Sequence, residues 1–150
     1  MIERDPEFWD GVASHEAVSP HIFMGTEPFS LKDIVSRELN MPLRSEHGGV
    51  LLLGLDGFGL VREMHTLYTP EGWGREVATN GKSFMHEAFK TTQVIFTHEQ
   101  EENWRSRPPK SHGWQSQGDF CYVGLTKRLK LWMLTREAFY ASPVGRKLCQ

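Results

Sequence analysis

An unbroken apolar run from Val50 to Leu55 is the feature that most constrains the fold of this chain. The run has the length of a buried strand, and Asp56-Gly57 directly after it is a strong signal for a tight hairpin. We therefore expect residues 59 to 68 to return as the antiparallel partner strand. Because alternate side chains of a strand point to opposite faces, Glu63 and His65 share one face of that partner.

Helical patterns flank the expected hairpin. Asp5-Pro6 favours a helix start near the N-terminus, because Asp caps helices and Pro fits the first helical position. Ser30 opens a second apolar face at helical spacing, which Asn40 and Pro42 should end. A long helix from about Arg75 to Lys90 follows the hairpin, and we expect Gly81 within it to pack closely against a sheet.

Short elements fill the rest of the chain. β-branched and aromatic residues predict a strand, a Pro-Pro pair ends one or two helical turns, and a Gly-Trp pair marks the entry to another strand. An antiparallel pair and a final short helix capped by Thr135 close the chain. The expected strand is Gln93–Thr97, and the helical turns span Glu99–Arg105. Gly113-Trp114 marks the strand entry, the antiparallel pair is Phe120–Val123 with Leu129–Leu134, and the final helix is Arg136–Tyr140.

This order of elements predicts one α+β domain over residues 1–150, an α/β sandwich with a mostly antiparallel central sheet and helices on both faces. Residues 1–45 form a helical N-terminal part and residues 49–134 the core. Residues 142–150 are expected to be a loose tail.

Composition excludes several functional classes. The net charge of −2 argues against a broad nucleic-acid interface, which needs a clustered basic surface. Two cysteines make no disulfide framework, and we expect neither a secretory signal nor a membrane span, because the first residues lack a basic region followed by an apolar one and the apolar stretches are too short. His and acidic residues lack the spacing of metal ligands. We therefore expect a protein of the cytoplasm that binds no metal, nucleic acid or membrane.

Two segments carry a resemblance to a known family. Residues 67–78 (LYTPEGWGREVA) lie between a strand and the long helix, and residues 96–114 run from Phe96-Thr97 through Asn103 to Gly113-Trp114. Together with the order of elements over roughly residues 50–134, they resemble the GNAT superfamily of N-acetyltransferases. That family keeps an acetyl-CoA pyrophosphate loop, Arg/Gln-x-x-Gly-x-Gly/Ala, before its long helix.

The chemistry of such a loop follows from main-chain amides at a helix N-terminus, which point at an anion, and from glycines that let phosphates approach. Two alignments compete. One places Thr69, Gly72 and Gly74 on the Arg/Gln, Gly and Gly/Ala positions. The other places residues 73, 76 and 78 there, and it puts the Glu76 carboxylate where pyrophosphate should lie. We favour the second alignment, because it gives the expected helix from Arg75 to Lys90 a better length.

The resemblance implies acetyl-CoA as the cofactor and an amine of unknown identity as the acceptor. Strand backbone near Leu67 would hold the pantetheine arm, and the loop would hold the pyrophosphate. The implied cofactor-binding residues are Leu67, Gly72, Trp73, Gly74, Arg75, Ala78 and Asn103.

Catalysis would need a base for the incoming amine, and Glu63 or His65 are the candidates because they share a strand face before the loop. The alternative is that both are surface residues of a half-exposed strand. The Tyr that family members often carry after the Asn, to protonate the leaving thiolate, is missing here, and Ser111 or His112 are the candidate acids nearby.

Two functions therefore stand side by side. One is an acetyltransferase of the GNAT type. The other is a GNAT-fold protein recruited for assembly without transfer chemistry, as in small virion-associated proteins of tailed phages, which this chain resembles in its short loop and missing Tyr. Trp73, Trp104 and Trp114 lie near arginines and would serve such an interface as anchors, or would instead cover the core beside the loop.

Overall fold

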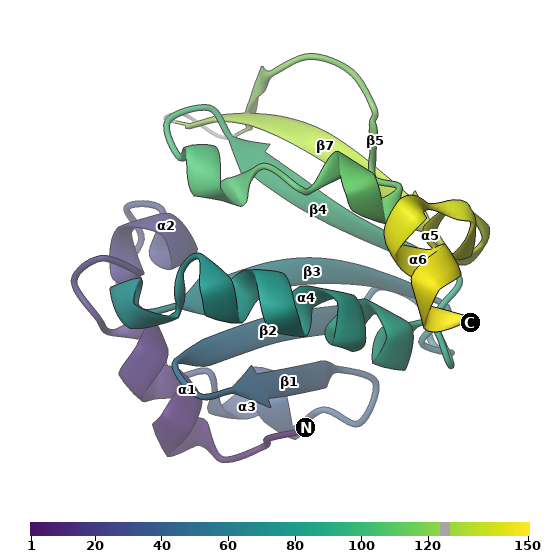
Figure 1. Ribbon diagram of the computed structural model, residues 1–150. Helices are drawn as coiled ribbons and strands as arrows, with labels where there is room; N and C mark the ends of the chain where they lie inside the picture. The colour runs from purple at the N-terminus through teal and green to yellow at the C-terminus, as the bar shows by residue number, and fades with distance from the viewer. Residues whose placement is uncertain (124–126) are drawn as a thin grey trace.

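One seven-stranded sheet organises the computed structural model, which describes residues 1–123 and 127–150 (Figure 1). Residues 124–126 of the expected 49–134 core lie outside the described residues. The strands are β1 Met41–Ser45, β2 Gly48–Gly54, β3 Val61–Tyr68, β4 Val94–Gln100, β5 Gln115–Ser116, β6 Cys121–Val123 and β7 Lys127–Thr135. The α-helices are α1 Pro6–Ala13, α2 Ser19–Phe23, α3 Lys32–Ser36, α4 Arg75–Ala88, α5 Arg136–Ala141 and α6 Pro143–Leu148.

The strand order across the sheet is β1-β2-β3-β4-β7-β5, and β6 also pairs with β7. Every pairing is antiparallel except that of β3 with β4. The predicted hairpin is confirmed as β2 and β3, and the expected closing pair is β6 and β7. The α+β fold class with a mostly antiparallel sheet is therefore confirmed.

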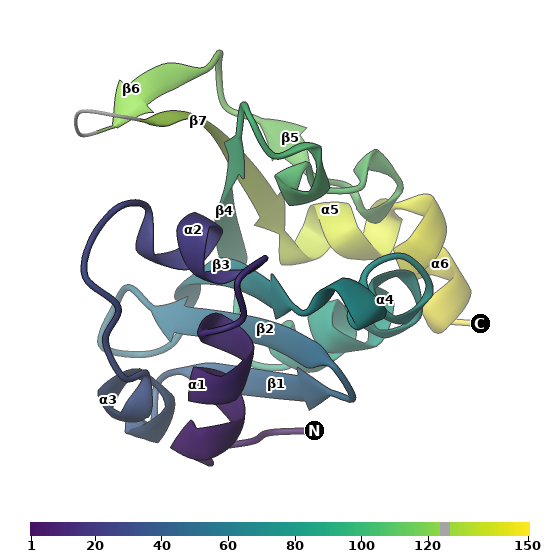
Figure 2. The ribbon, with the colours of Figure 1, turned by 90° about the vertical axis from the view of Figure 1, so that its left-hand side faces the viewer.

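The helices cover both faces of the sheet, as expected (Figure 2). The first cluster of buried side chains lies where α1 and α3 pack beside β2 and β3, and it includes Trp9, Val35 and Leu67. The second lies between α4, α5 and the opposite face, and it includes Phe84 and Phe139. None of the helices in the described ranges is long and apolar enough to cross a membrane.

The expected helical character of residues 1–45 is wrong at its end. Asn40 and Pro42 were expected to close a helix, but Met41–Ser45 forms β1. Pro42 is compatible with a strand here because β1 lies at the edge of the sheet. The preceding helix, α3, is only five residues long. The guanidinium of Arg4 donates to the carbonyls of Val35 and Arg37 at its end, which stabilises this early stop.

The expected helical turns over Glu99–Arg105 are also partly wrong. β4 continues through Glu99 to Gln100, because β7 pairs with it along its whole length. Two short 3₁₀ helices follow, η2 Trp104–Ser106 and η3 Lys110–His112. These turns lie on the same face of the sheet as α4, and side chains from η2, η3 and α4 line one cleft.

The tail is not loose. Residues 143–148 form α6, capped by the hydroxyl of Ser142, which accepts from the Gly145 amide at 3.0 Å. Val144 and Leu148 pack against the second cluster. Gly145 permits the close turn, since a Cβ there would lie 1.9 Å from the Phe139 carbonyl oxygen.

The strands β3 and β4 diverge, and this feature positions the site. Their parallel pairing covers only Val61↔Val94, Arg62↔Ile95 and Glu63↔Phe96. β3 nevertheless continues to Tyr68 and β4 to Gln100. The sheet is therefore split beyond Glu63 into two halves that separate toward the loop before α4 (Figure 1).

Candidate functional site

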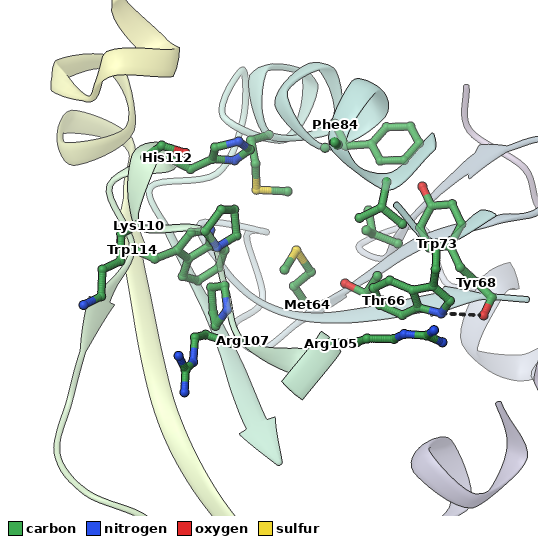
Figure 3. A pocket seen from close by; sticks show the side chains of 18 of the residues that line it. Met64, Thr66, Tyr68, Trp73, Phe84, Arg105, Arg107, Lys110, His112 and Trp114 are labelled. Carbon is green, nitrogen blue, oxygen red and sulfur yellow. Dashed lines mark hydrogen bonds between the residues drawn. The ribbon is translucent and has the colours of Figure 1, made fainter. Parts of the chain in front are cut away.

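A cleft of about 1140 Å³ lies where the two halves of the sheet separate, on the face covered by α4 (Figure 3). One wall comes from β3 and α4, and the other from the segment that contains η2 and η3. The described residues that line it include three cationic side chains and no carboxylate, so the cleft suits an anionic ligand with an apolar part. The lining includes Met64, Thr66, Tyr68, Trp73, Gly74, Val77, Ala78, Gly81, Phe84, Arg105, Arg107, Lys110, His112 and Trp114.

Main-chain groups of β3 point into the split. The Met64 carbonyl accepts from the Thr97 hydroxyl of β4 at 2.9 Å, and the Tyr68 carbonyl accepts from the Trp73 indole at 3.1 Å. Thr66 lies between these two residues, two positions from each. Because alternate residues of a strand direct their amides and carbonyls to the same side, the Thr66 main chain also points into the split.

Leu67, the expected contact for the pantetheine arm, does not lie on the cleft. Its side chain is buried in the first cluster, on the other face of the sheet. Its carbonyl lies against Gly48 of β2, where an added Cβ would be 2.0 Å from the oxygen. The residues that sequence reasoning missed are its neighbours Thr66 and Tyr68, which the same period-2 alternation places on the opposite face from Glu63 and His65.

The loop before α4 presents a helix N-terminus to the cleft. Gly74 is the N-cap residue with φ of 96°, and no side chain in the described part of the chain caps this end. The amides of the first helical turn therefore lack partners within the helix. Ala78 and Val77 line the cleft beside them. Such an end binds anions, because its amides and the helix dipole both favour negative charge.

Gly72 and Gly74 have different roles. Gly72 ends the 3₁₀ turn η1, Pro70–Gly72, and it is buried. A Cβ there would lie 2.6 Å from the Tyr68 ring, so packing requires this glycine. Gly74 has open space around it and lines the cleft, so of the two it is the residue that lets a ligand approach the main chain.

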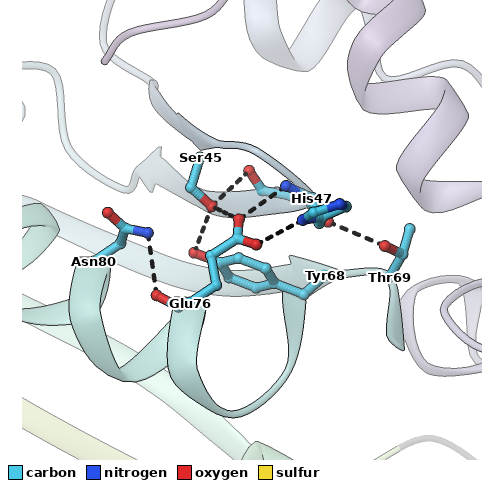
Figure 4. A network of polar contacts seen from close by, with 7 residues as sticks. Ser45, His47, Tyr68, Thr69, Glu76 and Asn80 are labelled. Carbon is cyan, nitrogen blue, oxygen red and sulfur yellow. Dashed lines mark hydrogen bonds and ion pairs between the residues drawn. The ribbon is translucent and has the colours of Figure 1, made fainter. Parts of the chain in front are cut away.

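Glu76 does not line the cleft, and its side chain points toward Ser45 and His47 (Figure 4). Its carboxylate accepts from the hydroxyl of Ser45 and from the His47 amide at 2.8 Å, and it lies 2.8 Å from His47 Nδ1. Burial acts to raise the pKa of Glu76, but the hydrogen bonds from His47 and Ser45 hold it below its usual range. The hydrogen bond to Glu76 in turn raises the pKa of His47. The expected clash of this carboxylate with an anion is therefore absent from the geometry.

The remaining loop residues divide between the cleft and the surface. Trp73 lines the cleft. Arg75 is exposed, at the first position of α4. Asn103 caps η2, where its side chain accepts from the Arg105 amide at 3.3 Å, so the turn accounts for this residue. From η2, both Trp104 and Arg105 line the cleft, and sequence reasoning did not single out Arg105 as a ligand.

Glu63 and His65 lie together on the opposite face of the sheet from the cleft. Glu63 Oε1 is 3.0 Å from His65 Nε2 and 3.5 Å from His98 Nδ1 on β4. Hydrogen bonds from His65 and His98 hold the pKa of Glu63 far below its usual range. Glu63 is also the last β3 residue that pairs with β4, so this group lies at the apex of the split.

His112, a candidate acid, lines the cleft, and burial lowers its pKa. Ser111 lines the cleft as well. In the described part of the chain, no three His, Cys, Asp or Glu side chains gather in a way that would hold a metal ion.

The sequence matches no protein-family model and no curated protein. The fold, however, is shared with solved structures. A GNAT-family acetyltransferase from Bacillus anthracis superimposes with a TM-score of 0.66 at 19% identity, over 91% of this chain and 92% of that one. The chain has the GNAT fold.

Other GNAT-fold structures agree over nearly their whole length. Spermidine N-acetyltransferase from Vibrio cholerae, in complex with CoA and spermine, has a TM-score of 0.63 at 14% identity, over 93% of this chain and 94% of that one. An aminoglycoside acetyltransferase in complex with coenzyme A has a TM-score of 0.63 at 15% identity, over 94% and 95%.

Proposed function

We propose that this GNAT-fold chain is an acetyl-CoA-dependent N-acetyltransferase. The observation that carries the proposal is the split between β3 and β4, with the N-terminus of α4 at its open end and a cleft along it whose described lining residues include no carboxylate. This arrangement suits a long ligand with an anionic group at one end and main-chain hydrogen bonding along an arm. The fold relatives crystallised with coenzyme A support the same ligand class.

Different residues would bind different parts of the ligand. The amides that follow Gly74 would hold the pyrophosphate, with Val77 and Ala78 beside it. The main chain of Thr66 and Tyr68 would bind the pantetheine arm. Acetyl-CoA, when bound, supplies an acetyl group activated as a thioester.

The acceptor amine would approach from the other face, where Glu63, His65 and His98 meet at the apex of the split. An amine attacks only after losing a proton, so a base must lie near. Glu63 is a weak base, because its lowered pKa means that it holds a proton poorly. We therefore assign proton removal to His65 or His98, and to Glu63 the role of orienting the imidazoles.

Calorimetry with CoA on two matched variants tests the ligand. Ala78→Glu adds a carboxylate to the cleft at the α4 N-terminus, whereas Thr79→Glu adds the same charge one exposed position further along the helix. We expect micromolar binding by the wild type, a loss of about tenfold or more for Ala78→Glu, and little change for Thr79→Glu. No detectable binding to the wild type at millimolar CoA would overturn the proposal.

Thiol release from acetyl-CoA in the presence of polyamines and aminoglycosides tests the transfer step. His65→Gln and His98→Gln should lower turnover without weakening CoA binding, because both side chains lie on the face away from the cleft. CoA binding without turnover on any amine would instead support the non-catalytic alternative, an assembly protein that keeps the GNAT fold.

A further inference from the structure

Arg105 lies at an unusual place for an exposed cation. Its guanidinium carbon is 5.6 Å from the centroid of the Trp73 ring and 5.5 Å from that of Trp104. Figure 3 shows its side chain extending along the cleft toward Trp73, whereas Arg107 points elsewhere. A side chain from η2 thus reaches the loop before α4, across the open end of the split.

The charge of Arg105 is available for a ligand. The neighbouring Arg107 pairs with the buried carboxylate of Glu99, Nε to Oε2 at 3.3 Å. Arg105 takes part in none of the ion pairs between the described residues. The carboxylate nearest in sequence to the helix start, Glu76, is bound to Ser45 and His47 on the other side. The positive field of Arg105 is therefore not neutralised within the cleft.

The loop needs a cation from elsewhere. A helix N-terminus offers the equivalent of about half a positive charge, whereas a diphosphate carries at least two negative charges at neutral pH. Within the loop, Trp73 is apolar and Arg75 is exposed without lining the cleft. A phosphate held by the α4 amides would thus remain undercompensated unless another element contributed a charge.

We propose that Arg105 supplies this charge and binds a phosphate of the ligand together with the α4 N-terminus. The inference rests on the proposed function and adds a residue to its site. A guanidinium suits the task, because its fork of N–H donors matches phosphate oxygens.

Neighbouring residues restrict the conformations of Arg105 before a phosphate binds. The Trp73 indole is fixed by its hydrogen bond to the Tyr68 carbonyl, so one of the two rings beside the guanidinium has a set position. Asn103 fixes the start of η2 by accepting from the Arg105 amide. Less conformational freedom is then lost when a phosphate binds. Trp104 is the second ring beside the guanidinium, and this contact would explain why a tryptophan stands at a position that is 79% exposed.

The test compares CoA with pantetheine, which has the same arm and no phosphate. Arg105→Gln should weaken CoA binding by about tenfold or more and leave pantetheine binding within about twofold, since only the phosphate contact is lost. Arg105→Lys should recover part of the affinity, because it restores the charge without the fork. The matched control is Arg37→Gln, which removes the same charge from an exposed arginine outside the cleft lining and should change CoA binding less than about threefold.

The outcomes separate the inference from the proposed function. If the wild type binds CoA and Arg105→Gln binds it equally well, the inference is overturned and the proposed function stands. If Arg105→Gln weakens pantetheine as much as CoA, Arg105 has only a structural role and the inference is again overturned. If the wild type binds no CoA, the proposed function is overturned, and the inference is overturned as well because it rests on that function.

Discussion

At the scale of single residues, charge placement distinguishes the two faces of the split. Glu63 on one face is kept ionised by two histidines, and Glu76 beside the other is kept ionised by Ser45 and His47. Neither carboxylate lines the cleft. Among the described residues, the cleft lining therefore holds cations and no carboxylate, while the negative charge of Glu63 lies on the face where an amine would arrive.

Glu63 should make stability depend on pH. Its pKa is lower in the folded chain than the ordinary 4.5, so its stabilising effect is fully present above pH 4.5 and is lost as the pH falls below that value. Because the ion pairs of Glu63 with His65 and His98 are partly exposed, we expect Glu63→Gln to lower the free energy of unfolding by about 1 kcal/mol at pH 6 to 7. The difference from the wild type should shrink as the pH falls below 4.5. Urea unfolding across this range measures it.

Glu16→Gln, an exposed acid-to-amide change on the surface, is the control for Glu63→Gln and should leave the pH profile nearly unchanged. A Glu63→Gln variant as stable as the wild type at every pH would contradict the ion pairs with His65 and His98.

At the scale of elements, the sequence correctly predicted the helix starts and turns that neighbouring residues determine. The apolar run with Asp56-Gly57 fixed the β2–β3 hairpin, and Thr135 correctly predicted the start of α5, where its hydroxyl accepts from the Ala138 amide. Elements that depend on distant partners were missed. β1 exists because β2 pairs with it, and Glu99 belongs to a strand because β7 continues beside it.

The site followed the same division. The sequence indicated the loop from Trp73 to Ala78 as a candidate, because glycines before a helix are a local signal. It did not indicate Arg105, which we propose as a ligand, because nothing in the sequence around it shows that η2 crosses the open end of the split. Gly81 was expected to pack against the sheet, but an added Cβ there would meet only His112 Cε1, at 3.7 Å, so this expectation is wrong.

The helix α6 provides an element-scale prediction. Truncation after Ala141 would remove the capping Ser142 and the apolar contacts of Val144 and Leu148. Two partly buried aliphatic side chains and a cap correspond to about 3 kcal/mol, so the melting temperature should fall markedly. Truncation after Leu148 removes only the exposed Cys149 and Gln150 and should have no effect. Equal melting temperatures for the two truncations would mean that the tail is loose after all.

At the scale of the whole molecule, the split would let one sheet serve both ligands of the proposed reaction. The halves β1–β3 and β4–β7 are joined by only three residue pairs between β3 and β4, and they separate beyond them. A ligand arm lying in the split from the α4 face would be accessible at the apex from the face that carries Glu63. The two substrates of the proposed reaction could then meet without sharing an entrance, which would account for the cleft and the Glu63 group lying on opposite faces.

This arrangement predicts that the cleft can be closed without unfolding the protein. Gly81 lines the cleft, and an added Cβ would make only an ordinary contact, 3.7 Å from His112 Cε1, so Gly81→Ala should stabilise α4 by about 0.5 to 1 kcal/mol and spare CoA binding. Gly81→Leu should fill the path of the arm and abolish both CoA binding and the rise in melting temperature that bound ligand produces. Lys82→Leu adds the same side chain at the next, exposed position of α4 and should bind CoA normally. Normal CoA affinity in Gly81→Leu would place the ligand elsewhere, because a leucine at that position and an arm beside α4 cannot occupy the same volume.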